Sequence, residues 1–313
     1  MDLCDDGSRS LPDAGWPVRT LLALLVLHVP TVVLGAVQSF QIDRSGGRKV
    51  PFFVFLPENL SRDASVLVLV PGYNGSGRDM LDAGWTEFAE REGLVLLAPT
   101  FETNVGELRR AEGYYYPEQW SGAVVEAGVR ELERREGVDT RKILIYGMSA
   151  GAHFAHRFAL WKPESVKAFV ACSAGWWSEP TEKLSGVPAL IMCGESDPRY
   201  RATLEFFDKA IAVGLPWVWR SYRYTGHDLT PAARRMAEVF LAHYAKEMRK
   251  LRCARSSLSP DPEAAASGKS QDWLWGDRQT YRWVGADQAD EIPPAVRVKL
   301  PSKEVAEVWE QEE

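Results

Sequence analysis

The stretch LIYGMSAGAHFAHRFAL, residues 144–160, joins an apolar run, a serine between two glycines, and a second run with apolar residues at helical spacing. Short apolar runs predict buried strands, and apolar residues repeating every three to four positions predict helices. The stretch therefore predicts a strand, a tight turn at Ser149 and a helix. Ligands of open parallel sheets bind at such strand-to-helix junctions, which makes Ser149 the first candidate for a functional residue.

The same alternation continues on both sides of this stretch. We predict strands at PFFVFLP, SVLVLVPG, LVLLAPT, KILIYG, VKAFVAC, PALIMCG and PWVWRSYRY, and helices at RDMLDAGWTEFAEREG, PEQWSGAVVEAGVRELERREG, 200–213 and 231–250. Gly93 and Gly137 are the expected ends of two of these helices. Strands and helices that alternate in this way predict an α/β fold, with a mostly parallel sheet and helices on both faces.

Composition limits the classes of protein to consider. The chain has 313 residues, of which 45% are hydrophobic and 26% charged, and its formal net charge is -6. These values indicate one sizeable globular domain with appendages rather than a disordered chain. No long run of Lys and Arg is present, and nucleic-acid phosphates would require a basic face, so nucleic acid is excluded as a partner. The oligomeric state is not predicted.

Residues 1–36 are predicted to be a signal peptide. Arg19 precedes a mostly apolar run that ends in small residues at Gly35 and Ala36, as export signals do. The run is short for a membrane-spanning helix, so no stable membrane anchor is expected after cleavage, and we expect a secreted or periplasmic protein. Four Asp residues precede the run, where a signal should be positive, and we therefore hypothesise that translation starts near Val18.

The main domain is predicted to occupy residues 37–250, and two segments follow it. Residues 251–271 include SSLSPDPEAAASGKSQ, whose Pro, Ser and Ala content predicts a flexible linker. Residues 272–313 form a short tail rich in Trp. These indole rings need a surface to cover, so the tail is expected to dock on the main domain. A small partner-binding arm is the alternative, and the sequence does not choose between them.

The cysteines do not form a recognisable disulfide framework. Removal of Cys4 with the signal leaves three cysteines, an odd number without a close pairing pattern. Cys172 and Cys193 end two apolar runs that are expected to be neighbouring strands, so they form either a bridge or two buried free thiols. The free thiols are the preferred interpretation.

A serine hydroxyl becomes a nucleophile when a histidine base, oriented by an acid, removes its proton. His227, in YRYTGHDLTP, follows a predicted strand and precedes a helix, which places it at the same sheet edge as Ser149. Asp197 in LIMCGESDPRY follows another strand and is the predicted acid, with Glu195 in the same loop as the runner-up. His153 lies one helical turn beyond the serine and approaches the expected pocket without being the base.

Backbone amides are expected to complete the site. Ala150 begins the helix after Ser149, where its amide would stabilise a developing oxyanion. The glycine-rich turn in LVLVPGYNGSG places the amide of Tyr73 as a second donor. This turn lacks the G-K-[ST] and G-x-G-x-x-G patterns of phosphate and dinucleotide sites. No metal or cofactor is implied. His153 and His156 stand three positions apart on one predicted helix, but no further His or Cys at metal-ligand spacing accompanies them.

The order VPGYNGSG, GMSAGAHFAHRFAL, CGESDP, GHDLTP resembles the α/β-hydrolase superfamily over roughly residues 38–250. Within it, the chain is similar to secreted esterases such as polyhydroxybutyrate depolymerases and feruloyl or acetylxylan esterases. The resemblance implies an α/β-hydrolase fold, with Ser149 as nucleophile, Asp197 as acid, His227 as base, and Tyr73 and Ala150 as oxyanion donors. Pro71 stands where many members carry histidine before the glycine, and this Pro-Gly-aromatic turn also resembles cutinase-like polyester hydrolases.

The sequence indicates the substrate less specifically than it indicates the catalytic residues. Trp176 and Trp177 fall where cutinase-like enzymes often carry a substrate-contacting tryptophan. With Tyr115 and Trp120 they form either an aromatic cleft for a sugar, a feruloyl ring or a polyester, or part of an aromatic core and rim. The resemblance implies ester hydrolysis by a serine esterase, without naming one ester. The alternatives are a serine peptidase of the same fold and a non-catalytic binding protein on a hydrolase scaffold.

Overall fold

The computed structural model describes residues 35–44, 46–102, 112–257 and 273–311, with side chains in the third range described up to residue 247. Residues 1–34, nearly all of the predicted signal peptide, and residues 258–272, most of the predicted linker, lie outside the described residues. None of the helices in the described ranges is both long and apolar enough to cross a lipid bilayer.

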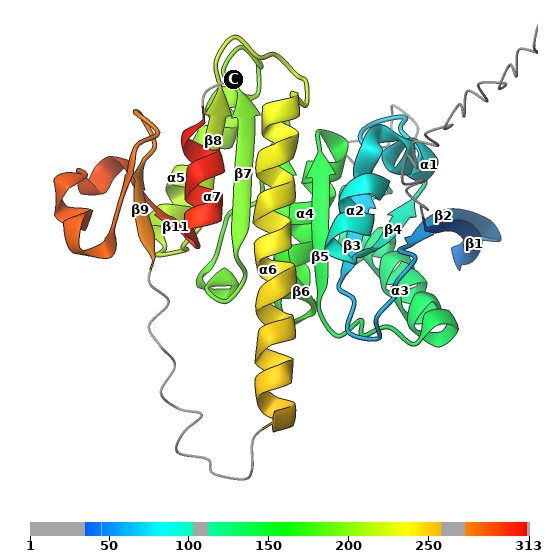
Figure 1. Cartoon of the computed structure of the whole chain (residues 1–313). Coiled ribbons are helices and arrows are strands. Elements are labelled where there is room, and N and C mark those ends of the chain that lie inside the picture. Colours follow the sequence, from blue (N-terminus) through cyan, green and yellow to red (C-terminus); the bar gives the residue numbers. More distant parts are fainter. Residues whose placement is uncertain (1–34, 45, 103–111, 258–272, 312–313) are drawn as a thin grey trace, which may run out of the picture. The chain divides into compact units, whose positions relative to one another are not determined.

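The chain forms strands and helices in alternation (Figure 1). The strands are β1 (Ala36–Arg44), β2 (Arg48–Leu56), β3 (Val66–Val70), β4 (Val95–Pro99), β5 (Ile143–Met148), β6 (Val166–Cys172), β7 (Ala189–Gly194), β8 (Val218–Tyr222), β9 (Leu274–Asp277), β10 (Trp283–Val284) and β11 (Arg297–Leu300). The helices are α1 (Gly77–Met80), α2 (Thr86–Glu92), α3 (Gly122–Glu136), α4 (Ala150–Trp161), α5 (Tyr200–Ala212), α6 (Pro231–Ser257) and α7 (Lys303–Glu310).

The main sheet has eight strands in the order β1-β2-β4-β3-β5-β6-β7-β8. The β1–β2 and β2–β4 pairs are antiparallel, and every pair from β4 through β8 is parallel. This arrangement confirms the predicted mostly parallel sheet. All residues of β3, β4, β6, β7 and β8 are buried, as expected for strands covered on both faces.

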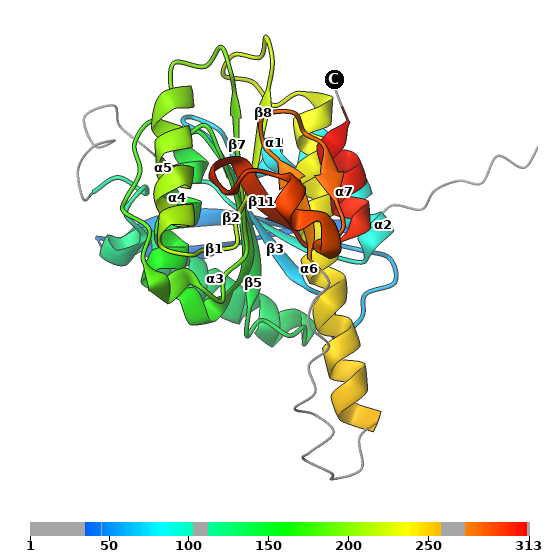
Figure 2. The ribbon, with the colours of Figure 1, turned by 90° about the vertical axis from the view of Figure 1, so that its left-hand side faces the viewer.

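Helices cover both faces of this sheet. Helices α3, α4 and α5 lie on one side of it, and α2 and α6 lie on the other (Figure 2). The core is therefore formed by the apolar strands and the inward faces of these helices. Because consecutive parallel strands all end at one edge, the loops after β5, β7 and β8 share that edge.

Three details differ from the sequence prediction. Strand β1 was not predicted, because Phe40 is its only buried residue and most of the others are exposed. The helix predicted around LDAGW is interrupted at Gly84, whose φ is 82°. Helix α6 continues to Ser257, so the predicted linker does not begin at residue 251; KLRCARSS contains no Gly or Pro to end the helix. Gly93 and Gly137 do end their helices in left-handed conformations.

The C-terminal segment forms a second sheet, β10-β9-β11, followed by α7. Trp309 of α7 is fully buried, and its indole N–H donates to the carbonyl oxygen of Trp219 in β8 at 2.6 Å. Arg278 forms an ion pair with Asp208 of α5 at 2.6 Å. Helix α7 also packs against α6 (Figure 1). The segment therefore covers the free edge of β8, which would otherwise leave backbone groups unpaired.

Candidate active site

Ser149 occupies a strained turn between β5 and α4. Its φ and ψ are 56° and -113°, values that a residue with a side chain rarely adopts. The Ser149 amide donates to the carbonyl oxygen of Cys172 at 2.8 Å, which fixes the turn to the neighbouring strand β6. Strain of this kind persists where the surrounding structure imposes it, and it gathers at functional sites.

The two glycines that flank Ser149 are required by close backbone contacts. A Cβ atom on Gly147 would lie 2.1 Å from the carbonyl oxygen of Gly151. A Cβ atom on Gly151 would lie 2.1 Å from the carbonyl oxygen of Val70 at the end of β3. Any side chain at either position would force the backbone apart. The glycine spacing of the motif is therefore explained by packing of α4 against the ends of β3 and β5.

His227 and Asp197 are directly hydrogen bonded. The His227 Nδ1 atom lies 2.7 Å from Asp197 Oδ2, and the Asp197 side chain is fully buried while that of His227 is 31% exposed. Burial alone raises the pKa of the Asp197 carboxyl, but hydrogen bonds from His227, the Arg199 amide and Ser173 outweigh it and lower the pKa. An ionised Asp197 accepts a hydrogen bond from the Nδ1–H of His227, so Nε2 of a neutral imidazole is left as the proton acceptor.

The three residues come from the same edge of the sheet. Ser149 follows β5, Asp197 lies in the loop after β7, and His227 follows β8. Glu195, the runner-up acid, instead accepts a hydrogen bond from the Ser221 hydroxyl at 2.8 Å. Of the two carboxylates in this loop, Asp197 is the one bonded to the histidine.

The glycine-rich turn after β3 lies beside the turn at Ser149 between β5 and α4, which we call the elbow. A Cβ atom on Gly72 would be 3.9 Å from the Cβ of Ser149. The turn is fixed by a hydrogen bond from the Tyr114 hydroxyl to the Pro71 carbonyl oxygen at 3.0 Å. Tyr73 directly follows Gly72, and Ala150 directly follows Ser149 as the first residue of α4. Ala150 thus adjoins the serine in the chain, and Tyr73 adjoins Gly72, which lies beside the serine.

His153 and His156 anchor the loop that follows β6. The Nε2 atom of His153 accepts from the Gly175 amide at 3.1 Å, and Nε2 of His156 accepts from the Ser178 amide at 3.1 Å. Burial, together with neighbouring positive charge from Arg157, holds the pKa of both imidazoles well below the ordinary value. Neutral rings are required here, because an imidazolium nitrogen cannot accept a hydrogen bond. His153 therefore supports the loop rather than acting on substrate.

Three of the four aromatic residues predicted to contact substrate gather around these histidines. Tyr115 stacks on His153 with a 4.8 Å centroid separation, and Trp176 lies 3.9 Å from His153. Trp177 stacks on Phe206 at 4.2 Å. Tyr115 is almost entirely buried, so it supports the loop from within the core.

Trp120 belongs to a different group of side chains. Its ring meets Phe101 edge to face at 5.6 Å, and the Arg44 guanidinium lies 3.3 Å above it. Its indole N–H donates to the Glu112 carbonyl oxygen at 2.7 Å. These contacts join β1 to the segment before α3. Trp120 therefore packs against these elements and does not join the group around Trp176.

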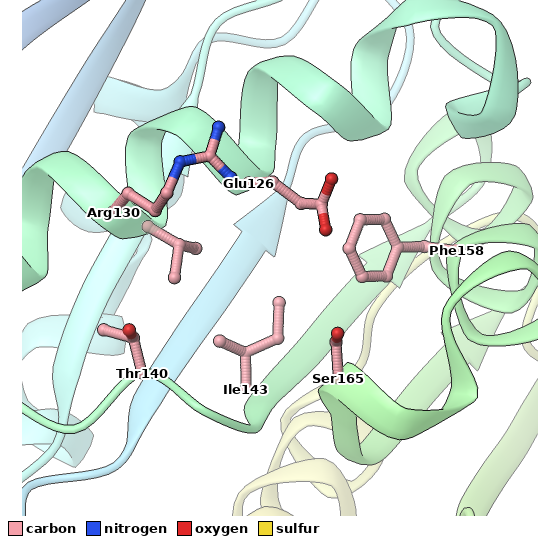
Figure 3. A pocket seen from close by; sticks show the side chains of 7 residues that line it. Glu126, Arg130, Thr140, Ile143, Phe158 and Ser165 are labelled. Atoms are coloured by element: carbon pink, nitrogen blue, oxygen red, sulfur yellow. The ribbon is translucent and has the colours of Figure 1, made fainter.

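Two cavities differ in their relation to this edge. One, of about 220 Å³, lies between the loop after β6 and α5, and is lined by Gly175, Trp176, Trp177, Ser178, Glu179, Ala202, Glu205, Phe206 and Lys209. The other, of about 130 Å³, includes Ile143, the first residue of β5, and thus lies at the opposite end of that strand from Ser149 (Figure 3). Of these two cavities, the first is the one formed by a loop at the sheet edge that carries Ser149.

Sequence reasoning missed two residues that hold Asp197. The Arg199 amide donates to Asp197 Oδ1 at 2.9 Å, and the Arg199 guanidinium donates to the same oxygen at 3.2 Å. Ser173, whose φ is 57°, also bonds Asp197. The DPR sequence could have indicated Arg199, because an amide two residues after an aspartate commonly bonds its carboxylate. Nothing in the sequence pattern around Ser173 indicates its role.

Cys172 and Cys193 are buried free thiols, and the bridge left open by the sequence is absent between these two described residues. Burial raises the pKa of Cys172 to about 12. The Ser173 hydroxyl lies 3.3 Å from the Cys193 sulfur. The thiols therefore act as apolar core groups beneath the acid.

No protein-family profile matches the sequence, and no curated protein matches it. The structure is similar to a ferulic acid esterase, with TM-score 0.57, 18% identity and coverage of 68% of this chain and 98% of that one. It is also similar to a poly(3-hydroxybutyrate) depolymerase from Bordetella parapertussis (TM-score 0.54, 21% identity, 74% and 94% covered). A third similar structure is a fluorophosphonate-binding serine hydrolase from Staphylococcus aureus (TM-score 0.55, 15% identity, 68% and 99% covered). With the strand order and the strained serine turn, these likenesses identify the fold of the chain as the α/β-hydrolase fold.

Proposed function

We propose that the chain is a serine carboxylic-ester hydrolase that forms an acyl-enzyme intermediate. Ser149 is the nucleophile, His227 the general base and Asp197 the acid that orients it. The observation that carries this proposal is the 2.7 Å hydrogen bond between His227 and the buried Asp197, at the sheet edge where Ser149 is held in a strained turn. Fold alone would not support an activity, because one fold hosts many functions.

In the first half-reaction, the Ser149 oxygen attacks the ester carbonyl carbon while Nε2 of His227 takes the hydroxyl proton. Asp197 keeps Nδ1 protonated and stabilises the imidazolium that forms. The amides of Tyr73 and Ala150 donate to the oxyanion. Collapse of the tetrahedral intermediate breaks the ester C–O bond, and His227 returns its proton to the leaving alcohol. Water then cleaves the acyl-enzyme by the same route.

The proposed substrates are polyesters, acylated polysaccharides and related esters. Trp176 and Trp177 line the 220 Å³ cavity between the loop after β6 and α5, and indole rings provide a broad apolar surface for a sugar, a feruloyl ring or a polyester repeat. Similarity to a ferulic acid esterase and a polyhydroxybutyrate depolymerase supports this substrate class. Tyr115 and Trp120 are proposed to support the cleft rather than to contact substrate.

We also propose export through residues 1–36, followed by action outside the cytoplasm. Arg19, the apolar run after it and the small residues near Gly35 support an export signal. Substrates as large as polyesters or polysaccharides fit this location. N-terminal sequencing of the intracellular precursor and of the exported protein tests both the cleavage site and the start near Val18; a precursor beginning at Met1 would refute that start.

The activity is tested with p-nitrophenyl acetate and butyrate, using the wild type and Ser149→Ala. We expect turnover by the wild type and a loss of roughly 10⁶-fold in the variant. A matched panel of p-nitroanilides separates an esterase from a peptidase of the same fold. Polyester film, feruloylated xylan and acetylated xylan then separate the proposed substrates. A folded wild type without turnover on any ester would overturn the proposal.

A further inference from the structure

The C-terminal segment supplies hydrogen-bonding groups to the outer edge of β8. The Trp309 indole donates to the carbonyl oxygen of Trp219, and the Tyr281 hydroxyl oxygen accepts from the Ser221 amide at 2.9 Å. Backbone groups two residues apart on a strand face the same side, so these two side chains satisfy groups that a further strand would otherwise pair with.

The contact at Ser221 continues toward the acid loop. The Ser221 hydroxyl donates to Glu195 Oε1 at 2.8 Å and also lies 2.7 Å from the Tyr281 hydroxyl. A hydroxyl has one proton, so if Ser221 gives its proton to the carboxylate, Tyr281 must be the donor in their shared hydrogen bond. The chain of hydrogen bonds therefore has one direction, from Tyr281 through Ser221 to Glu195.

Glu195 lies in the loop after β7, which carries Asp197 and is hydrogen bonded to the loop after β8, which carries His227. Its amide donates to the Tyr222 carbonyl oxygen at 2.9 Å, and the next amide, of Ser196, donates to the Thr225 carbonyl oxygen at 2.9 Å. Ser196 directly precedes Asp197, and Thr225 lies two residues before His227. The hydrogen bonds that end at Glu195 therefore support the segment that sets the separation of acid and base.

We propose that Tyr281 is a positioning residue for the Asp197–His227 pair, and that the C-terminal segment is in this way part of the catalytic unit. This inference rests on the proposed function. The role of Tyr281 is indirect: its hydroxyl holds Ser221, and Ser221 holds Glu195 in the loop that carries Asp197. Its ring lies 5.0 Å from that of Trp309, and the Arg220 guanidinium lies 3.8 Å above it, so Tyr281→Phe removes the hydroxyl while keeping both ring contacts.

The test measures kcat and KM of the full chain on p-nitrophenyl butyrate. Tyr281→Phe is expected to lower kcat about tenfold with KM little changed, less than the roughly 10²-fold that a 1 Å misplacement can cost. Glu195→Leu should give the same loss, and Glu195→Gln, which keeps an oxygen acceptor, should recover most of it. Asp208→Ala removes the Arg278 ion pair, a different contact of the segment, and should keep the wild-type kcat.

The outcomes separate this inference from the proposed function. An active wild type with an unchanged kcat in Tyr281→Phe would overturn the positioning role and leave the esterase intact. An equal loss in Asp208→Ala would also overturn it, because the segment would then act only by docking. An inactive wild type would overturn the proposed function and the inference with it. If Tyr281→Phe fails to fold, the comparison of Glu195→Leu with Glu195→Gln decides, since Glu195 is exposed.

Discussion

The imidazole of His227 and the carboxylate of Asp197 are 2.7 Å apart, although 30 residues separate them in the chain. Two neighbouring parallel strands, β7 and β8, bring them together. The loops after these strands are further joined by the hydrogen bond from Ser196 to Thr225. The proposed acid and base are thus brought together by neighbouring strands, as the proposed serine catalysis requires.

Because only Asp197 contacts His227, replacing Asp197 and replacing Glu195 should change kcat by different amounts. Asp197→Asn should lower kcat by roughly 10⁴-fold, because the amide no longer selects the productive imidazole tautomer. Glu195→Gln should keep most of the wild-type kcat, since Glu195 contacts Ser221 rather than His227 and the amide keeps an oxygen acceptor. Steady-state hydrolysis of p-nitrophenyl butyrate measures both. A larger loss in Glu195→Gln than in Asp197→Asn would contradict the assignment of the acid.

The elbow glycines predict a stability effect. Gly151→Ala should lower the free energy of unfolding by about 3 kcal/mol, at the upper end of overpacking costs, because the new methyl would meet the Val70 carbonyl oxygen at 2.1 Å. Gly186→Ala is the matched control, since nothing lies within 4 Å of its added Cβ. Urea unfolding gives both values. Equal stability of the two variants would contradict the close packing at the elbow.

The buried histidines predict that stability depends on pH. The pKa of His156 in the folded protein lies well below its ordinary value because of burial and Arg157. The unfolded chain therefore binds the proton more tightly, so the stabilisation is complete above about pH 6.5 and is lost as the pH falls below it. The free energy of unfolding should therefore fall between pH 6.5 and 5, by no more than about 2 kcal/mol from this one residue, which is the limit for one proton over this range.

The control for this prediction is His156→Gln, whose amide oxygen can still accept from the Ser178 amide but does not titrate. Urea unfolding midpoints at pH 5, 6, 7 and 8 should fall less steeply for this variant than for the wild type. His153 remains in both proteins and accounts for a residual slope in the same direction. An identical pH dependence of the two proteins would refute the role assigned to His156.

The C-terminal segment predicts a further stability effect. Trp309 is fully buried and donates to Trp219, so Trp309→Phe should cost about 3 kcal/mol through lost packing and an unpaired carbonyl oxygen. Trp283 is less buried and donates to exposed Glu310, so Trp283→Phe should cost about 1 kcal/mol or less. Chemical denaturation distinguishes them. A negligible effect of Trp309→Phe would mean that docking of α7 adds nothing to stability.

The sequence was sufficient for the parallel sheet because its central strands are continuous apolar runs. Ser149 could be selected because its flanking glycines and the following helix form a local pattern. Strand β1 could not be predicted, since only one of its residues is buried. The supporting roles of His153 and His156 depend on amides 22 residues away, and the contact of Tyr281 with Ser221 spans 60 residues. Such contacts are fixed by tertiary packing and leave no local pattern.

Covalent labelling of the full chain with a fluorophosphonate, followed by peptide mass mapping, tests the role of Ser149 directly. We predict one adduct per chain, carried by Ser149, absent from Ser149→Ala and formed much more slowly in His227→Ala. An adduct on another serine, or a folded wild type that forms none, would contradict the assignment of Ser149 as the nucleophile.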